Sequence, residues 1–493
     1  MTFVTAKQIS ITNFALSKQK KLVMKIEQIY TGCLAQGAYY IVSDGEAAII
    51  DPLRETMPYT DRLKRDNVKL KYIFETHFHA DFVSGHLDLS KQTAAKIVYG
   101  PNAAPEFEFI SAKDNQIFEI GNIKIKVLHT PGHTMESTTY LLIDANGKDH
   151  AIFSGDTLFL GDVGRPDLAQ KAANTTQEQL AGILFHSLRN KIMPLADDVV
   201  VYPAHGAGSA CGKNMSKETV GTIGEQKATN YALRANMTKT EFISEVTDGL
   251  LPPPNYFGMN VAMNKKGIPT FEKILNAGMN EISTTNFEAI AAETGALILD
   301  TRNNGDFAVG AVPQSINIGI NGDFAPWVGA LIENVKQPIM LVADIDKIEE
   351  SITRLSRVGF DHVIGHLKGG FEAWKKAGFG IETVNRITAQ TFENEWNNND
   401  KIVIDIRKFN EYEAEHVAEA FLRPLAEIND WIKDIDPEKH FFLHCAGGYR
   451  SMIAASILQA RGYRNFSEIE GGFNAISKTN VPKTDFICQS KVH

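Results

Sequence analysis

The chain of 493 residues has few cysteines, no long apolar run and no excess of positive charge. Its four cysteines are too sparse for the disulfide framework of a small secreted domain. The sequence contains no run of about 18 apolar residues, so a membrane span is not expected. The formal net charge of −9 argues against nucleic-acid binding through the phosphate backbone, because that mode of binding needs a basic face.

The composition is that of an ordinary globular protein, and the chain is too long for one hydrophobic core, so several domains are expected. Residues 1–23 carry a mildly apolar run that polar residues interrupt, and no cleavage site of small residues follows it. A secretory signal is therefore not expected. Because the globular pattern begins at Met24, we interpret this segment as a loose, disordered extension or as an overlong gene prediction, and we expect a cytoplasmic protein with reduced thiols.

In the first half of the chain, four apolar segments each end in side chains that can bind a metal. The segments are β-branched, as strands are, and strand ends at one sheet edge can present several ligands to one cation. Imidazole and carboxylate groups are ligands of zinc and of non-haem iron. A single His-x-His pair is more often structural, but ligands at four successive strand ends predict a metal site. The segments are 71–75 with His77, His79 and Asp81, 123–128 with His133, 151–153 with Asp156, and 199–202 with His205.

In this order, these residues resemble the ligand motifs of the metallo-β-lactamase fold, and the resemblance covers residues 25–270. It implies an αββα sandwich with the metal at the edge between the two sheets. In the dinuclear hydrolases of this fold, including the glyoxalase II thioesterases, a histidine follows the aspartate and binds a second zinc. Here Phe82 follows Asp81, and phenylalanine cannot bind a metal, so a single metal is favoured.

Two histidines and one carboxylate with open positions suit an iron(II) that activates O2. With the segments 155–158 and 164–167, the pattern resembles the persulfide dioxygenase family, whose members oxidise a persulfide sulfur to sulfite with O2 at one iron. Those members usually keep a histidine at the position of Phe82, so we expect this change to alter the substrate pocket. The resemblance implies that His77, His133 and Asp156 bind one Fe(II) per chain, and that His79, Asp81 and His205 orient ligands and substrate.

Arg165 in the segment 164–167 has two interpretations. It can bind an anionic substrate, or it can pair only with Asp167 in the same loop.

The rest of the chain contains an internal repeat. Asp300 and Arg302 recur as Asp405 and Arg407, and a Gly-Gly-Phe sequence at 369–371 recurs at 471–473. The spacing of about 100 residues is that of a small domain. Apolar strand segments alternate with helical segments in each copy, which predicts two α/β domains with mostly parallel sheets.

Cys445 follows the strand segment 440–444, and a loop with two glycines leads from it to Arg450 and a helix over 451–461. The backbone N–H groups of this loop, the positive end of the helix dipole and the positive charge of Arg450 all favour a thiolate and an anionic persulfide. A buried, inert cysteine is the minority interpretation here. Four residues separate the cysteine from the arginine, one fewer than in cysteine phosphatases, which suits the transfer of a single sulfur. The last hundred residues resemble a rhodanese sulfurtransferase, which implies that Cys445 carries the persulfide.

The middle copy also resembles rhodanese, but no cysteine lies between Cys211 and Cys445, so we predict that it is inactive. Cys211 lies on a loop of small residues that begins at the metal site, and we predict that it carries sulfur. Cys33 is a weaker candidate for that role, and Cys488 is interpreted as incidental. The predicted domains are an extension at 1–23, a metallo-β-lactamase-like domain at 24–275, an inactive rhodanese-like domain at 280–383 and an active one at 387–486.

The predicted protein is of mixed α/β and α+β class, and its three parts are similar to bacterial persulfide dioxygenase–sulfurtransferases of sulfide detoxification. The expected substrates are a small-molecule persulfide and O2, with sulfite and thiosulfate as product or donor. The resemblance implies a homo-oligomer, and neither nucleic acid nor membrane is an expected partner. The alternatives are a zinc-dependent thioester hydrolase of the glyoxalase II kind fused to a sulfurtransferase, and a sulfur carrier whose metal site is vestigial.

Overall fold

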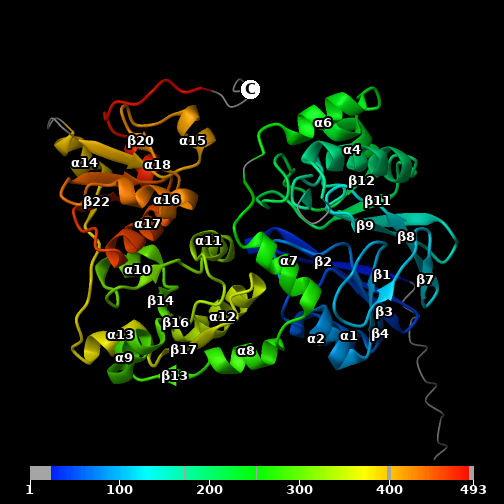
Figure 1. Cartoon of the computed structure of the whole chain (residues 1–493), viewed down its shortest axis with the longest axis horizontal. Helices are drawn as coiled ribbons and strands as arrows, with labels where there is room; N and C mark the ends of the chain where they lie inside the picture. The colour runs from blue at the N-terminus through cyan, green and yellow to red at the C-terminus, as the bar shows by residue number, and fades with distance from the viewer. Residues whose placement is uncertain (1–23, 171–173, 251, 397–400, 488–493) are drawn as a thin grey trace, which may run out of the picture.

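The computed structural model describes residues 24–170, 174–250, 252–396 and 401–487. The predicted extension at 1–23 and Cys488 lie outside these residues. Figure 1 shows a layered body at the right, which contains the first half of the chain, and two smaller units stacked at the left.

The first body contains two six-stranded sheets that face each other. Apolar side chains from both sheets meet between them, among them Tyr39, Phe74, Val127 and Phe153. Both faces of the central strand Gln36–Ser43 are covered, which explains why all eight of its residues are buried. In order of pairing the strands are β1 (Lys25–Thr31), β2 (Gln36–Ser43), β3 (Glu46–Ile50), β4 (Lys69–Glu75), β5 (Lys96–Tyr99) and β6 (Ile110–Ser111) in one sheet. The other sheet is β12 (Gly221–Thr222), β11 (Val200–Pro203), β10 (Asp149–Gly155), β9 (Thr138–Ile143), β8 (Ile123–His129) and β7 (Ile117–Ile120).

Helices cover the outer face of each sheet, which completes the predicted αββα sandwich. Tyr59 and Leu89 anchor two helices on the first sheet, and Leu184 and Phe242 anchor two on the second. Capping boxes at Thr176, Thr222 and Thr238 begin the helices of the second layer. The helices are α1 (Met57–Asp66) and α2 (His86–Thr93) on the first sheet, and α4 (Gln177–Ser187), α5 (Ile223–Thr229) and α6 (Lys239–Thr247) on the second.

The two smaller units share one topology, as the sequence repeat predicts. Each has a five-stranded sheet in which every pair of strands is parallel. The order in the middle unit is β13 (Glu281–Ile282), β17 (Val363–Leu367), β16 (Ile339–Val342), β14 (Leu297–Asp300) and β15 (Ile316–Asn317). In the last unit it is β18 (Arg386–Ile387), β22 (Phe466–Ile469), β21 (Phe441–His444), β19 (Ile402–Asp405) and β20 (Phe421–Leu422).

Helices flank both parallel sheets (Figure 1). Those of the middle unit are α9 (Thr284–Thr294), α10 (Asn304–Val309), α11 (Phe324–Leu331), α12 (Ile348–Arg357) and α13 (Gly370–Lys376). Those of the last unit are α14 (Ala389–Glu395), α15 (Phe409–Ala414), α16 (Ile428–Trp431), α17 (Tyr449–Ala460) and α18 (Gly472–Ile476).

The repeated Asp-x-Arg and Gly-Gly-Phe sequences have a structural role that is the same in both units. Arg302 donates to both carboxylate oxygens of Asp300, and its guanidinium lies 4.1 Å from the centre of the Phe371 ring. Arg407 does the same with Asp405 and lies 4.2 Å from the Phe473 ring. A buried, bidentate ion pair capped by an aromatic ring therefore fixes the end of β14 or β19 against the following loop.

The sandwich and the middle unit are joined by α7 (Phe257–Lys266) and α8 (Phe271–Gly278), and α8 contacts α12 and β17. Two ion pairs cross this junction. Arg54 of the sandwich binds Asp361 at 3.1 Å, and Glu55 binds Arg357 at the end of α12. Since the Arg54 side chain is only 1% exposed, its loss of water is compensated chiefly by this contact and by the carbonyl oxygen of Pro269.

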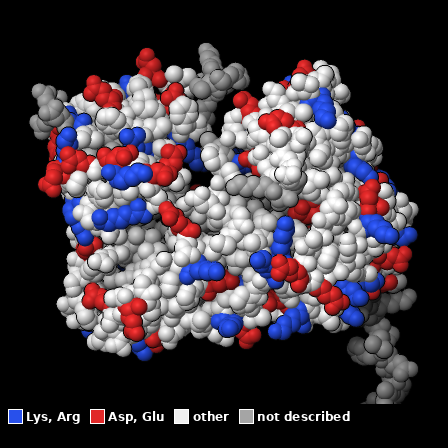
Figure 2. Space-filling view, viewed as in Figure 1, with Lys and Arg blue, Asp and Glu red and all other residues white. Residues whose placement is uncertain are grey.

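On the face shown in Figure 2, lysine and arginine are interspersed with aspartate and glutamate over all three units. This face therefore has no broad basic surface of the kind that binds a phosphate backbone. None of the helices in the described part of the chain is both long and apolar enough to span a membrane.

Candidate functional site

The ends of β4, β8, β10 and β11 place three histidines around one carboxylate at the edge of the sandwich. Nε2 of His77 lies 3.8 Å, and Nε2 of His133 lies 3.3 Å, from Oδ2 of Asp156. Nε2 of His205 lies 3.6 Å from the other carboxylate oxygen of Asp156. Potential ligand atoms of His77, His133 and Asp156 all lie within 4.8 Å of one another, so one cation could contact all three.

Each of these imidazoles is oriented through its other ring nitrogen. Nδ1 of His77 lies 3.0 Å from the Thr76 hydroxyl, and Nδ1 of His133 lies 2.8 Å from the carbonyl oxygen of Arg165. Nδ1 of His205 lies 3.3 Å from the carbonyl oxygen of Ala35. Such contacts fix the ring and leave Nε2 for a metal.

The donor set fits a bound divalent cation. Both carboxylate oxygens of Asp156 and of Asp81, and Nε2 of His205, are buried and make no hydrogen bond within the described residues. Burying charged groups in this way is costly unless a cation compensates them. Burial and the charges of the neighbouring imidazoles lower the pKa of His77 well below its usual value, which keeps the ring neutral, as a metal ligand must be.

A second group of potential ligands comprises Asp81, His205 and Cys211, whose ligand atoms also lie within 4.8 Å of one another. Burial, followed by the charges of Asp81 and Asp156, raises the pKa of the Cys211 thiol well above its usual value. Phe82 is fully buried and stacks on the ring of His79 at 4.2 Å between centroids. It therefore adds an apolar wall where the dinuclear hydrolases have a ligand.

The ring of His79 lies 4.2 Å from that of His77 between centroids, and its Nε2 faces a pair of carboxylates that the sequence interpretation missed. Its Nε2 lies 3.1 Å from Asp51 and 3.3 Å from Glu75. Burial alone would lower the pKa of His79, but these two carboxylates raise it well above its usual value. Asp51 also accepts from the backbone N–H and the hydroxyl of Thr76, which in turn contacts His77. His79 and Asp51 thus stabilise the loop after β4 that carries His77.

The expectation that site residues lie at the ends of strands could have indicated both of these carboxylates, because Asp51 directly follows β3 and Glu75 is the last residue of β4.

Arg165 makes the local contact that the sequence left open. Nε and Nη2 of its guanidinium each donate at 2.7 Å to the carboxylate of Asp167, and Nη1 donates to the carbonyl oxygen of Ala210. Its backbone N–H donates to the carbonyl oxygen of Cys211, and its own carbonyl oxygen orients His133. The residue therefore ties the Cys211 loop to a metal-facing histidine.

The middle unit packs against the sandwich close to these metal-facing residues. Tyr256 packs against Gly329 of α11 in the middle unit. Burial, followed by the charges of Asp81 and Cys211, raises the pKa of the Tyr256 hydroxyl. Cys33 lies in the short 3-10 helix Gly32–Leu34, is half-buried, and its sulfur lies 3.6 Å from Nη1 of Arg357. Tyr256 is a further residue beside Asp81 and Cys211 that no local sequence pattern indicates.

The second centre lies far along the chain, where Cys445 follows β21 and precedes α17. Its Sγ accepts from the backbone N–H of Gly448 at 3.1 Å and lies 3.5 Å from the Ser451 hydroxyl. The repeated Gly-Gly-Phe sequence supports this loop, because the N–H of Phe473 donates to the carbonyl oxygen of Cys445. Gly472 has a φ of +54°, and a Cβ there would lie 2.4 Å from the same oxygen, so only glycine fits.

Arg450 turns its guanidinium toward Glu411 of α15, to which it donates two hydrogen bonds of 2.6 and 2.7 Å. The middle unit holds the other side of the loop. Nδ2 of Asn304 donates to the carbonyl oxygen of Gly448, and the Tyr449 hydroxyl donates to that of Gly319. In the middle unit itself, Ala343 follows the strand equivalent to β21, so no thiol is present there.

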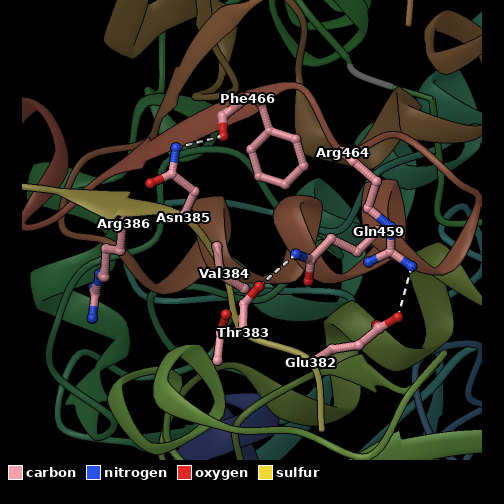
Figure 3. Close-up of a pocket in the computed structure, with 8 residues that line it drawn as sticks. All are labelled: Glu382, Thr383, Val384, Asn385, Arg386, Gln459, Arg464 and Phe466. Atoms are coloured by element: carbon pink, nitrogen blue, oxygen red, sulfur yellow. Dashed lines mark hydrogen bonds and ion pairs between the residues drawn. The ribbon is translucent and has the colours of Figure 1, made fainter. Parts of the chain in front are cut away.

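A cavity of about 490 Å³ lies where the linker between the two parallel-sheet units runs past α17 and β22. Figure 3 shows Arg464 directed to Glu382, and Gln459 directed to the backbone of Thr383. Arg386 stands at the edge of the cavity and extends away from this group (Figure 3). Both arginines bind carboxylates of the chain, since Nε of Arg386 donates to Glu468 at 2.8 Å.

Comparison with known families agrees with this division of the chain. Residues 31–205 match the metallo-beta-lactamase superfamily, and residues 283–377 and 388–479 each match the rhodanese-like domain. The crystal structure of a metallo-beta-lactamase from Staphylococcus aureus is similar, with a TM-score of 0.62 and 30% sequence identity. It covers 70% of this chain and 98% of its own.

Relatives of two kinds share the first domain. A hydroxyacylglutathione hydrolase of Tolumonas auensis is 34% identical over 170 residues, which are 34% of this chain and 60% of the relative. The mitochondrial persulfide dioxygenase of Homo sapiens is 29% identical over 242 residues, which are 47% of this chain and 84% of the relative. The chain thus spans about 60% of the length of the hydrolase and most of the dioxygenase.

Proposed function

Because the chain belongs to the metallo-beta-lactamase superfamily and continues into two rhodanese-like domains, the organisation of a persulfide dioxygenase–rhodanese fusion, we propose that it oxidises persulfides and transfers their sulfur. In this proposal the first centre converts a persulfide, O2 and water to a thiol and sulfite. The second centre exchanges sulfur between Cys445 and sulfite, with thiosulfate as the product or the donor. Such a pair of reactions serves sulfide detoxification.

The observation that carries the first half is the set of His77, His133 and Asp156, with Phe82 in place of a second-site ligand. Two imidazoles and one carboxylate leave positions open for substrate and O2, and a bound iron(II) would supply the activation of O2. The Thr76 hydroxyl and the Arg165 carbonyl oxygen orient the two imidazoles. The apolar side chains of Phe82, Phe159 and Tyr256 keep bulk water from the reacting sulfur.

Asp81, His205 and Cys211 form a second buried group of potential ligands, and Nε2 of His205 lies 3.6 Å from Asp156 of the first group. We assign Asp81 and His205 to the orientation of substrate, and Cys211 to the acceptance of a sulfur atom. Burial and the charges of Asp81 and Asp156 raise the pKa of Cys211, which disfavours its thiolate unless a positive charge lies nearby.

At the second centre, Cys445 is proposed as the nucleophile. The backbone N–H of Gly448 donates to its sulfur, and the start of α17 places further positive partial charge beside it. Arg450 is held by Glu411 at the side of the loop, where its charge favours the approach of sulfite or thiosulfate. The loop between Cys445 and Arg450 is sized for one sulfur.

A zinc-dependent thioester hydrolase remains the second candidate, and the similarity to hydroxyacylglutathione hydrolases favours it. Its prediction differs in metal and in reaction. The hydrolase needs no O2 and is expected to hold zinc, whereas the dioxygenase is expected to hold one iron per chain.

The test is to prepare the protein without oxygen, to measure its bound metal, and to add glutathione persulfide while O2 is recorded. We expect about one iron per chain and O2 uptake that Asp156→Asn abolishes together with the iron. Bound zinc, no O2 uptake and rapid hydrolysis of a glutathione thioester would replace the dioxygenase with the hydrolase.

A further inference from the structure

Glu468 is a fully buried carboxylate of β22, behind the proposed nucleophile, and the sulfur transfer described above gives it no role. Ionisable side chains are rarely buried this completely unless they are paired. Both of its oxygens are bonded. The Ser451 hydroxyl donates to Oε1 at 2.5 Å, and Nε of Arg386 donates to Oε2 at 2.8 Å.

Ser451 connects this carboxylate to the thiol. Its Oγ lies 3.5 Å from Sγ of Cys445, and both residues are buried. A hydroxyl has one proton to donate and lone pairs with which to accept. While Ser451 donates to Glu468, it can therefore accept the S–H proton of Cys445. The result is one continuous chain of contacts, from the loop after β21 through α17 and β22 to the linker strand β18.

We propose that Glu468 is a positioning residue that receives the Cys445 proton through the Ser451 hydroxyl, which prepares the thiolate for sulfur transfer. This inference rests on the proposed sulfurtransferase function. The thiol gives its proton to Oγ of Ser451 as Ser451 gives its own to Oε1, which leaves a thiolate and a neutral carboxylic acid. The thiolate then attacks the outer sulfur of thiosulfate. A new S–S bond forms, and the old one breaks with its electron pair leaving on sulfite.

The charges around Glu468 suit this exchange. Burial raises its pKa, although Ser451 and Arg386 oppose the shift, and Glu470, just after the end of β22, adds to it. Arg386 also faces the nucleophile loop, because a Cβ placed on Gly448 would lie 3.3 Å from its Nη2. When the proton moves to Glu468, the negative charge moves to the sulfur and stays near the same guanidinium. The transfer therefore leaves no cation without a nearby anion.

The silent middle unit supplies an internal comparison. Three residues before the Gly-Gly pair, β22 carries Glu468 whereas β17 carries His366. His366 is buried, and its Nδ1 makes no hydrogen bond within the described residues. The unit that lacks the thiol thus also lacks the carboxylate and its contacts, as expected if Glu468 serves the thiol and not the fold.

The test uses the full-length protein and two readouts across a range of pH. One is the rate at which iodoacetamide alkylates Cys445, followed on the peptide that contains it. The other is the single-turnover release of sulfite from thiosulfate. The variants are Glu468→Gln, which keeps the shape but cannot accept a proton, and Ser451→Ala, which removes the link. Ser451→Thr keeps a hydroxyl. Glu470→Gln removes an exposed charge that lies 3.7 Å from Nη1 of Arg386, but it leaves the contacts of Glu468 with Ser451 and with Nε of Arg386 in place.

In the wild type we expect alkylation to rise in two steps with pH, because Cys445 and Glu468 share one proton over the intermediate range. Glu468→Gln and Ser451→Ala should each show a single step, and sulfite release at about pH 6 should fall roughly 100-fold. Ser451→Thr and Glu470→Gln should keep both steps. If Glu468→Gln does not fold, as circular dichroism would reveal, the two serine variants decide.

Two steps that persist in Ser451→Ala or Glu468→Gln would overturn the proposal. So would an equal loss of rate at every pH with an unchanged profile, since that result indicates a structural role alone. Two steps that depend on Glu468, in a wild type that releases no sulfite from thiosulfate, would uphold the proton transfer and refute the sulfurtransferase function.

Discussion

The contact between the middle unit and the nucleophile loop (residues 446–450) predicts that Gly322→Ala slows sulfur transfer at Cys445, although Gly322 lies in the middle unit. A Cβ at Gly322 would stand 2.4 Å from Cζ of Tyr449. Ordinary contact between carbon atoms needs about 3.5 Å, so the ring must move by about 1 Å. The ring is not free to turn aside, because its hydroxyl donates to the carbonyl oxygen of Gly319 at 2.8 Å.

A movement of the Tyr449 ring displaces the neighbouring residues that contact the Cys445 thiol. Tyr449 lies between Gly448, whose N–H donates to Cys445 at 3.1 Å, and Arg450. A displacement of about 1 Å can reduce a rate by about 100-fold when it disturbs reacting groups, which corresponds to about 3 kcal/mol of activation free energy. We therefore expect kcat/KM for thiosulfate formation to fall by about this factor.

The assay compares sulfur transfer with O2 uptake in the same preparations. Gly322→Ala should leave O2 uptake with glutathione persulfide unchanged, because the nearest atoms that its Cβ would meet belong to Tyr449 and not to a residue of the metal-facing group. Gly305→Ala, in the same unit, is the matched control, since a Cβ there meets nothing within 4 Å. In a Tyr449→Ala background the Gly322 substitution should have little further effect. Transfer at the wild-type rate by Gly322→Ala would refute the idea that the middle unit holds the nucleophile loop in place.

Three more predictions concern the junction and the two centres. Burial raises the pKa of Asp361 to about 6 although Arg54 opposes it, so its stabilising contribution is complete below its ordinary pKa and is lost as pH rises through about 6. Between about pH 4 and 7 the wild type should lose up to roughly 3 kcal/mol of unfolding free energy relative to Asp361→Asn, measured in urea, and parallel pH profiles would contradict this. Phe82→His should raise the zinc that the protein can bind from about one to about two per chain, because it adds a donor beside Asp81 and His205, and unchanged stoichiometry would count against a missing second site. Arg450→Lys should lose one of two charge-assisted bonds to Glu411 and lower kcat/KM for sulfur transfer by roughly 30-fold, or about 2 kcal/mol, whereas an active lysine variant would mean that only the charge matters.

The architecture follows from local patterns, which is why sequence alone predicted it. Apolar strands that end in polar residues and a repeat of about 100 residues depend only on neighbours in the chain. The observation that potential ligands follow strand ends predicted that His77, His133 and Asp156 lie at one sheet edge. It also applied to Asp51 and Glu75, but a carboxylate at a strand end does not reveal whether it faces a metal or a histidine.

Contacts between units could not be predicted in this way. Tyr256 lies beside Asp81 and Cys211 where α11 of another unit packs against it, and Asn304 reaches the nucleophile loop across a domain boundary. In the sequence, Glu468 looks like an ordinary polar residue of a strand. It is buried because α17 and β18 pack around it in the fold. Arg165 shows the same limit, because only the fold decides that its side chain meets Asp167 while its backbone orients His133.

The measurement that tests the coupling of the two centres most directly is product analysis after aerobic turnover of glutathione persulfide by the wild type and by Cys445→Ser. We predict that the wild type accumulates thiosulfate. The variant should consume O2 at the same rate and accumulate sulfite instead. Thiosulfate from the variant at the wild-type rate, or no O2 uptake by either protein, would contradict the account.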